Sequence, residues 1–319
     1  MSVNIVEDTH NFLAMLEKKI NIDRNSYSNK VLICGMGGSG IGGRIMETLA
    51  NCVSFGEIFA WNNYGIPEWM TSNDNVICVS YSGNTAETLS AAKKASEMGC
   101  QIEIITTGGE LGDLADKHNW DKTIVESGHQ PRAALPLLLK PILCKLNYPN
   151  LEEMIKEVSE QDYQIKQIED IATKLSGKIP CIYTESSLEP VGYRWRCQIQ
   201  ENAKQLAFHH VVPEMNHNEI VGWTNSNPNM VPVLIRKINE EYKNSLGMIT
   251  KKQILNQIEK FKIEEIPENL VEQEMKILSQ GLKEDDIKSK KKEIETKAKK
   301  RIKIGLIINE YGEQNKIKV

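Results

Sequence analysis

Three hydroxyl side chains lie within six positions of the segment VSYSGNTAET (residues 79–88), at Ser80, Ser82 and Thr85. An apolar run precedes them and a helix-like stretch follows, so the pattern predicts a loop that joins a strand to a helix. A helix N-cap would account for one of these hydroxyls but not for three. Because a phosphate monoester accepts several hydrogen bonds and helix N-termini attract anions, we interpret the loop as a phosphate site.

A glycine-rich loop, GMGGSGIGG at residues 35–43, follows another apolar run. Its bare backbone lets amide groups approach a ligand, and Gly38 and Ser39 stand at the entrance to the next helix. Loops at the carboxyl ends of neighbouring parallel strands meet in one crevice. We therefore expect Gly38 and Ser39 to bind the same phosphate as the three hydroxyls.

The glycine loop has other interpretations, and a purely structural tight turn is one of them. Gly35, Gly37 and Gly40 also satisfy the GxGxxG pattern of dinucleotide-binding folds. Those folds need an acidic residue at the end of the second strand, where this chain reads AWNNYG, and Glu57 lies at the strand's other end. A Walker loop does not fit, because Ile41 rather than a lysine follows Gly40. A dinucleotide-dependent oxidoreductase is thus supported only by the literal glycine pattern.

Apolar runs alternate with helix-like segments over the first half of the chain, which is typical of a parallel sheet covered by helices on both faces. The predicted strands are residues 30–34, 57–61, 75–80, 101–106 and 122–126. An apolar helix over 132–146 closes this unit, and Pro136 and Pro141 predict a kink or a break in it.

The turn-rich NYPN before Leu151 predicts a domain boundary, so we expect two domains, residues 1–150 and 151–319. The second is predicted to be another α/β domain of similar plan, with an atypical lysine-rich C-terminal segment. Its expected elements are a helical stretch at 151–176, a strand at 179–185, a helix at 189–207, an irregular segment at 209–223 and a strand at 229–236.

The composition is that of an ordinary globular protein, with 319 residues and a net charge of −4. We therefore expect neither a nucleic-acid partner nor a membrane partner. Residues 283–303 carry ten Lys or Arg against five Asp or Glu, and a solvated helix face is favoured there over a nucleic-acid contact. The seven cysteines form no CxxC pair, and the N-terminal MSVNIVEDTHNF lacks a basic region followed by an apolar core. We therefore expect a cytoplasmic protein without metal or cofactor.

Together with three later motifs, the two loops resemble the sugar isomerase (SIS) domains of the bifunctional phosphoglucose/phosphomannose isomerases. The later motifs are HQPRAALP (129–136), QENAKQLAF (200–208) and PEMNHNEIVGW (213–223). The resemblance covers about residues 28–235. It implies an α/β fold of two doubly wound parallel-sheet SIS domains. It also implies an aldose–ketose isomerase that interconverts glucose 6-phosphate, and mannose 6-phosphate, with fructose 6-phosphate through an enediol.

The resemblance also assigns roles to three residues of these motifs. Arg132 stands near a helix start, where the helix dipole favours anions, so it indicates a bound anion or else a surface salt bridge, and the resemblance implies that it binds the substrate. Glu201 alone is typical of a solvated helix carboxylate, but the resemblance makes it the base that carries a proton between C1 and C2. His217 is either a loop histidine or, as the resemblance implies, the group that opens the sugar ring, contributed by the partner subunit of a homodimer.

The last third of the chain, from about residue 237, lacks the landmarks of this family. Its members usually have a lysine near the C-terminus that joins the active site, and no motif here selects one. A phosphosugar sensor that binds without turnover is therefore the main alternative. Sensors of that type usually carry a helix-turn-helix before the SIS domain, and only about 30 residues precede the first predicted strand here.

Overall fold

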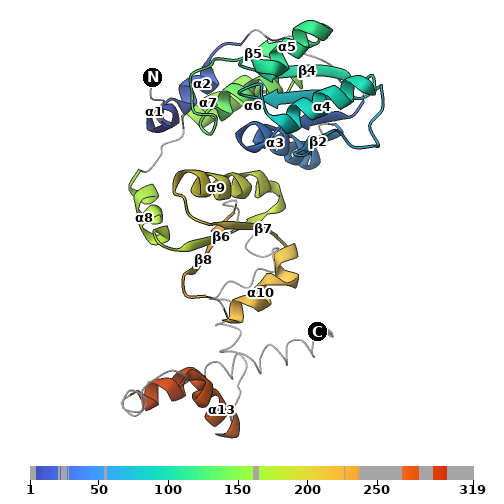
Figure 1. Cartoon of the computed structure of the whole chain (residues 1–319). Helices are drawn as coiled ribbons and strands as arrows, with labels where there is room; N and C mark the ends of the chain where they lie inside the picture. Colours follow the sequence, from blue (N-terminus) through green and yellow to red (C-terminus); the bar gives the residue numbers. More distant parts are fainter. Residues whose placement is uncertain are drawn as a thin grey trace. The chain divides into compact units, whose positions relative to one another are not determined.

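The computed structural model of the chain is drawn in Figure 1. It describes residues 5–20, 22, 27, 29–53, 56–160, 165–225, 227–236, 268–279 and 290–299. The chain divides into two compact units, Met1–Ile238 and Asn239–Val319. The domain boundary expected near residue 150 falls inside the first unit and stays a prediction.

A five-stranded parallel sheet forms the core of the first part of this unit. Its strands are β1 (Val31–Cys34), β2 (Ile58–Trp61), β3 (Asn75–Ser80), β4 (Gln101–Thr106) and β5 (Asp121–Ile124). Their order is β2-β1-β3-β4-β5, and every neighbouring pair is parallel. The predicted α/β fold is confirmed. Because the chain proceeds in opposite directions from β1 and β3, the crevice of a doubly wound sheet lies beyond the carboxyl ends of these two strands.

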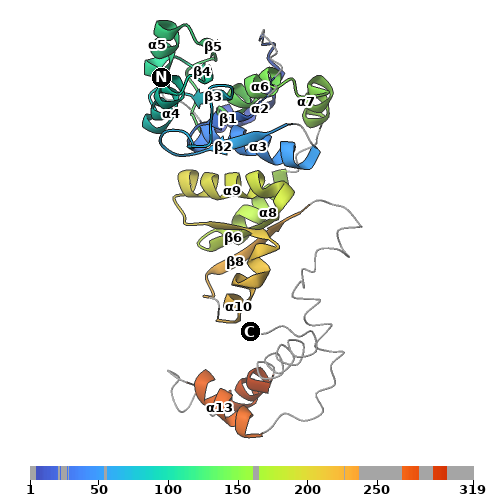
Figure 2. The same cartoon turned by 90° about the vertical axis from the view of Figure 1, so that its right-hand side faces the viewer.

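Helices cover both faces of this sheet, as Figures 1 and 2 show. They are α3 (Gly37–Val53), α4 (Ala86–Glu97), α5 (Gly109–His118) and α6 (Leu135–Lys145). Alternate strand residues face opposite sides: Ile33 and Ile77 belong to a cluster with side chains of α3 and α6, whereas Leu32 belongs to the cluster of α4 and α5. Strands that are buried on both faces are apolar throughout, which is why they were visible in the sequence.

Helix α6 is continuous through Pro141, so the break that the prolines predicted is absent from it. Pro136 lies in the first turn, where a missing N–H removes no helix hydrogen bond. Pro141 does remove one, but the helix buries Leu138 and Ile142 against the sheet. The packing of this apolar face outweighs the lost hydrogen bond.

Two helices, α1 (Ile5–His10) and α2 (Phe12–Glu17), precede β1, and two more lead from α6 to the second sheet. The latter are α7 (Leu151–Ser159) and α8 (Ile165–Leu175), where the sequence predicted a single helical stretch.

A second parallel sheet consists of β6 (Ile179–Glu185), β7 (Phe208–Val212) and β8 (Met230–Ile235), in the order β7-β6-β8. This order repeats that of the first three strands of the first sheet, β2-β1-β3. A short 3₁₀ turn, η1 (Ser186–Leu188), leads from β6 into α9 (Glu189–Asn202), which contacts β6 and β7. The segment predicted to be irregular therefore begins with a strand, and this part of the prediction is wrong.

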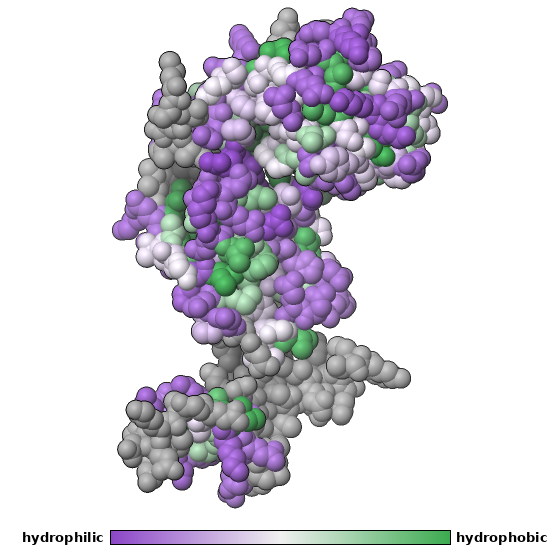
Figure 3. Space-filling view, in the orientation of Figure 1, coloured by the Kyte–Doolittle hydropathy of each residue, from purple (hydrophilic) through white to green (hydrophobic). Residues whose placement is uncertain are grey.

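After β7 the chain forms short helical turns, η2 (Glu214–His217), α10 (Glu219–Gly222) and η3 (Trp223–Asn225). The second sheet is less covered than the first: all six residues of β3 are buried, and none of β8 is. The view in Figure 3 shows hydrophobic side chains at the surface of this part of the chain. Its exposed large apolar side chains include Leu206, Phe208, Val221 and Leu234.

In the second unit the structure describes α13 (Glu268–Leu278) and a helix over 291–299. Along the latter, Ile294 and Ala298 are buried, whereas the charged side chains are mostly exposed. Lys297 pairs with Glu293 at 2.8 Å, one helical turn away. This part of the lysine-rich segment has the solvated face that the sequence predicted. No helix within the described ranges is long and apolar enough to cross a membrane.

Candidate active site

The glycine loop and the hydroxyl loop lie against each other at the carboxyl ends of β1 and β3. The backbone N–H of Tyr81 donates a hydrogen bond to Oγ of Ser39 at 3.1 Å. Helix α3 begins at Gly37, so Gly38 and Ser39 both lie in its first turn, where the N–H of Ser39 donates to the carbonyl oxygen of Met36 at 2.9 Å. The two loops that the sequence placed in one crevice do meet there.

Close backbone approaches explain two of the glycines. A Cβ atom at Gly38 would lie 2.8 Å from the carbonyl oxygen of Pro131, which belongs to the HQPR motif. Gly83 has a φ of +71°, and a Cβ atom there would lie 1.8 Å from the carbonyl oxygen of Gly108. Side chains would therefore separate these loops from their neighbours.

The three hydroxyls of the second loop differ in their surroundings. Ser80 is fully buried, and its Oγ lies 2.9 Å from Oγ1 of Thr85 and accepts a hydrogen bond from the N–H of Gly83. Thr85 is the N-cap residue of α4, but its side chain makes no capping hydrogen bond, so capping does not explain it. Ser82 is exposed and accepts a hydrogen bond from the N–H of Asn84 at 3.2 Å. Ser80 thus braces the turn, while Ser82 and the partly exposed Thr85 are open to a ligand.

The segment before Arg132 is held by two residues that the sequence did not reveal, Asp8 and Tyr81. Asp8 in α1 is buried, lies 2.8 Å from Nδ1 of His129, and accepts a hydrogen bond from the N–H of Gln130 at 2.7 Å. Burial alone would raise the pKa of Asp8, but these hydrogen bonds and the charge of His129 lower it. The Tyr81 hydroxyl accepts a hydrogen bond from the N–H of His129 at 3.0 Å. The hydroxyl loop is thereby connected to the HQPR motif.

Arg132 and Glu201 are close together. Nε of Arg132 donates to Oδ1 of Asn202 at 2.9 Å and lies 3.8 Å from Oε2 of Glu201. Arg132 precedes α6, which begins at Leu135, whereas Glu201 and Asn202 end α9. A base and a fixed cation side by side are the groups that proton transfer through a negatively charged intermediate requires.

His217 is exposed at the end of η2, and no hydrogen bond in the described part of the chain joins it to Glu201. The neighbouring His209 is enclosed instead: Oγ1 of Thr184 lies 2.9 Å from its Nε2, and a Cβ atom at Gly192 would lie 2.5 Å from the ring. Burial, together with the charges of Arg196, His210 and Arg44, lowers the pKa of His209 to about 4. His209 is therefore a neutral, packed residue at neutral pH.

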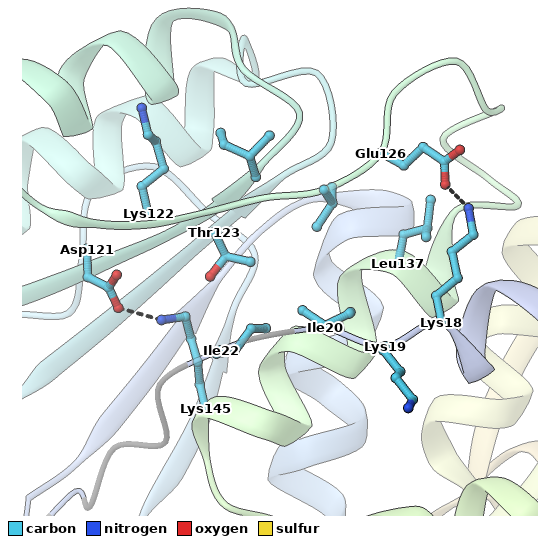
Figure 4. A pocket seen from close by; sticks show the side chains of 12 residues that line it. Lys18, Lys19, Ile20, Ile22, Asp121, Lys122, Thr123, Glu126, Leu137 and Lys145 are labelled. Atoms are coloured by element: carbon cyan, nitrogen blue, oxygen red, sulfur yellow. Dashed lines mark hydrogen bonds and ion pairs between the residues drawn. The ribbon is translucent and has the colours of Figure 1, made fainter.

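Two hollows in the described structure lie elsewhere and contain none of the predicted site residues. Figure 4 shows one, of about 440 Å³, between β5 and the segment after α2. Lys145 on its wall contacts Asp121 at 2.6 Å and Glu103 at 2.7 Å. Burial alone would lower the pKa of Lys145, but its two carboxylate partners raise it. This charge cluster is saturated and holds the edge strand to α6. No group of three or more His, Cys, Asp and Glu side chains in the described ranges is placed to hold a metal ion.

Comparison with known proteins shows the family. Residues 165–279 match the family model "Bacterial phospho-glucose isomerase C-terminal SIS domain". The bifunctional phosphoglucose/phosphomannose isomerase of Thermoplasma acidophilum is 37% identical over 215 residues, which are 65% of this chain and 67% of that protein. The chain belongs to the bifunctional phosphoglucose/phosphomannose isomerase family. The predicted family and the predicted enzyme class, an aldose–ketose isomerase, are confirmed.

Another relative of this isomerase-family chain has a different reaction in its name. The D-glucosamine-6-phosphate 4-epimerase of Sulfolobus acidocaldarius is 32% identical over 216 residues, 65% of this chain and 69% of that protein. The C-terminal domain of glucosamine-fructose-6-phosphate aminotransferase from Francisella tularensis has a similar fold, with a TM-score of 0.51 at 14% identity, over 79% of this chain and 78% of that one.

A further relative of this isomerase-family chain is of an unrelated kind. The trigger factor of Pelagibacter ubique is 65% identical over 88 residues, which are 27% of this chain and 18% of that protein. The isomerase motifs extend from Gly35 to Trp223, and only the stretch after Trp223 is long enough to hold 88 residues without one. We therefore assign this similarity to the C-terminal part, although the SIS family model extends into it as far as residue 279.

Proposed function

We propose that this chain interconverts glucose 6-phosphate, and mannose 6-phosphate, with fructose 6-phosphate through an enediol intermediate. The main support for the proposal is that Arg132 lies beside Glu201. Arg132 belongs to the segment 129–132, which also contacts both phosphate-type loops. Two relatives that are 37% identical to this chain are named phosphoglucose/phosphomannose isomerases.

In this proposal the phosphate binds at the amide group of Gly38, beside Ser39, and at the hydroxyls of the second loop. Ser82 and Thr85 donate to it directly. Ser39 and Ser80 contribute mainly by fixing the loops, because the Ser39 hydroxyl accepts from the N–H of Tyr81 in the other loop and Ser80 is fully buried. Neutral donors and helix amides then bind the anion locally in a chain whose net charge is negative.

The proton transfer needs one base. The Glu201 carboxylate removes a proton from C2 of the aldose, and the carbonyl oxygen at C1 gains a proton, which gives the enediol. In the second half of the reaction the hydroxyl at C2 loses its proton, and Glu201 returns the first proton to C1. Arg132 stabilises the negative charge that develops on the enediol oxygens. Aldoses that differ only at C2 give the same enediol, so one site can accept both. His217 from a partner subunit opens the sugar ring, which makes the active species a homodimer.

One observation favours a second function, phosphosugar binding without turnover. The chain covers about two thirds of the isomerase relatives, and 88 of its residues, which we assign to its C-terminal part, are similar to trigger factor. If a catalytic group of the relatives lies in the third that this chain does not cover, the chain would lack that group and would still have both phosphate-type loops. The proposal therefore needs a test that separates binding from turnover.

The test uses the purified full chain, EDTA and fructose 6-phosphate. Formation of glucose 6-phosphate and mannose 6-phosphate is followed by coupled assays, and affinity is measured by calorimetry. Turnover in the presence of the chelator supports the isomerase. Binding without turnover would leave the sensor, and inversion at C4 of glucosamine 6-phosphate, followed by NMR, would indicate the reaction for which the Sulfolobus relative is named.

A further inference from the structure

One face of α9 is directed at Arg132. Arg194, Gln198 and Asn202 recur every four residues and so lie one above another along the helix. Glu201, the proposed base, lies on the same side of its last turn and is 3.8 Å from Arg132. The base and the side chains that surround Arg132 are thus carried by a single rigid element.

Two of these side chains bind the backbone of Arg132, not its guanidinium. Nη2 of Arg194 and Nε2 of Gln198 both donate to the carbonyl oxygen of Arg132, the latter at 3.0 Å. Asn202 then links the set, because its Nδ2 donates to Oε1 of Gln198 at 2.6 Å while its Oδ1 accepts from Nε of Arg132. Arg132 is therefore fixed at both its carbonyl and its side chain.

Arg194 also lies beside the glycine loop. Its Nη1 is 3.7 Å from the position a Cβ atom would take at Gly38, and the same position is 2.8 Å from the carbonyl oxygen of Pro131. Burial lowers the pKa of Arg194. Within the described residues it has no ion-pair partner, so its contacts with the Arg132 carbonyl and the loop account for its placement.

We propose that Arg194 and Gln198 are positioning residues for the reaction: by binding the Arg132 carbonyl, they set the distance between the Arg132 guanidinium and Glu201. This proposal rests on the proposed function for its kinetic consequences, but the geometry itself is independent of turnover. Two groups that act on one reacting carbon pair must be placed to within a fraction of an ångström, and a misplacement of about 1 Å can cost about a hundredfold in rate.

The test compares Arg194→Met and Gln198→Leu, which remove the donors at nearly constant size, with Arg196→Met. Arg196 is on the same helix but stacks on Tyr193, at 4.4 Å from the ring centroid, and makes no bond to Arg132. We expect kcat for fructose 6-phosphate to fall about 10- to 100-fold in the first two variants, with KM within about threefold. Arg196→Met should retain the wild-type kcat.

Additivity tests whether Arg194 acts through Arg132. In an Arg132→Met background the Arg194→Met change should cost nothing further in kcat, because no guanidinium remains to be positioned. Equal losses in both backgrounds would overturn the proposal. Melting temperatures of all variants are measured alongside, and Arg194→Lys, which keeps a donor, should recover part of the rate if Arg194→Met does not fold.

An NMR readout keeps the inference separate from the proposed function. The Nε–H signal of Arg132, identified by its loss in Arg132→Lys, should shift or broaden in Arg194→Met and in Gln198→Leu but not in Arg196→Met. If the wild-type chain shows no turnover, the proposed function fails and this signal still decides the positioning role. An Arg132 signal that is unchanged in both variants would refute it.

Discussion

Nε of Arg132 lies 3.8 Å from Oε2 of Glu201, with side-chain exposures of 31% and 42%. A pair that is this open to water adds little to stability, typically about 0–1 kcal/mol. Its value is in placement, since it holds a cation beside the group proposed to move a proton. The sequence separates these residues by a sheet strand and four helices, and only the fold brings them together.

Replacing Glu201 by glutamine should lower kcat for fructose 6-phosphate by at least about 100-fold, because the amide cannot accept the proton. Phosphosugar affinity should stay close to that of the wild type, since the phosphate loops are intact. Glu189→Gln is the matched control, on the first turn of the same helix and paired with Arg44 at 3.2 Å. A near-normal rate in Glu201→Gln would remove this residue as the base.

The hydroxyl loop gives a second prediction, in which similar serines behave differently. Ser82→Ala combined with Thr85→Ala should mainly weaken binding of fructose 6-phosphate, by about tenfold or more, although the free energy of unfolding also loses the bond between Thr85 and Ser80. Ser80→Ala should mainly reduce that free energy, by about 0.5–1.5 kcal/mol, because it removes the buried hydroxyl that accepts from the N–H of Gly83 and bonds to the Thr85 hydroxyl. Calorimetry and urea unfolding measure the two effects. Unchanged affinity in the double variant would contradict the phosphate assignment.

His209 predicts a pH dependence of stability. Its pKa of about 4 in the folded protein lies below the ordinary value of about 6.5, so the unfolded chain binds more protons between these values. The free energy of unfolding should therefore fall as the pH is lowered from about 6.5 to about 4. In His209→Gln this part of the slope should disappear, whereas a change at the exposed His118 should leave it. Urea unfolding at pH 7, 6 and 5 provides the measurement.

The buried Lys145 provides a stability prediction with a built-in comparison. Its side chain is 1% exposed and contacts Glu103 and Asp121, so Lys145→Met removes the cation beside the buried Glu103 carboxylate and should cost about 3–5 kcal/mol. Lys122→Met breaks a pair with Asp116, whose side chain is 70% exposed, and should cost about 0–1 kcal/mol. Equal losses in urea unfolding would show that the cluster is not what holds β5 to α6.

Most of the first sheet could be predicted because burial on both faces leaves its strands apolar; β3 and β4 begin and end at the predicted residues. β7 could not, because His209 and His210 interrupt the apolar pattern. His209 becomes acceptable in a strand only when its ring packs on Gly192 of α9, a contact that no local pattern encodes.

The candidate site also contains some residues that the sequence revealed and others that it did not. The two phosphate-type loops were visible because each packs its small and hydroxyl residues into a few consecutive positions. Asp8 was invisible, since its contact with His129 spans 121 residues and nothing near it in the sequence indicates the partner. One helix face could have been predicted from spacing, because Arg194, Gln198 and Asn202 recur every four residues. The sequence motif identified only Glu201, which lies beside them.

Residues 129–132 act as a short tether. His129 and Gln130 are bound by Asp8 and Tyr81, whereas Arg132 is bound by α9. The three Cα–Cα steps of this segment reach at most about 11 Å. If α9 moved away from the phosphate loops by more than this length, its contacts with Arg132 would break. The hydrogen bonds at both ends of this segment therefore couple the position of Arg132 to the hydroxyl loop and to α9.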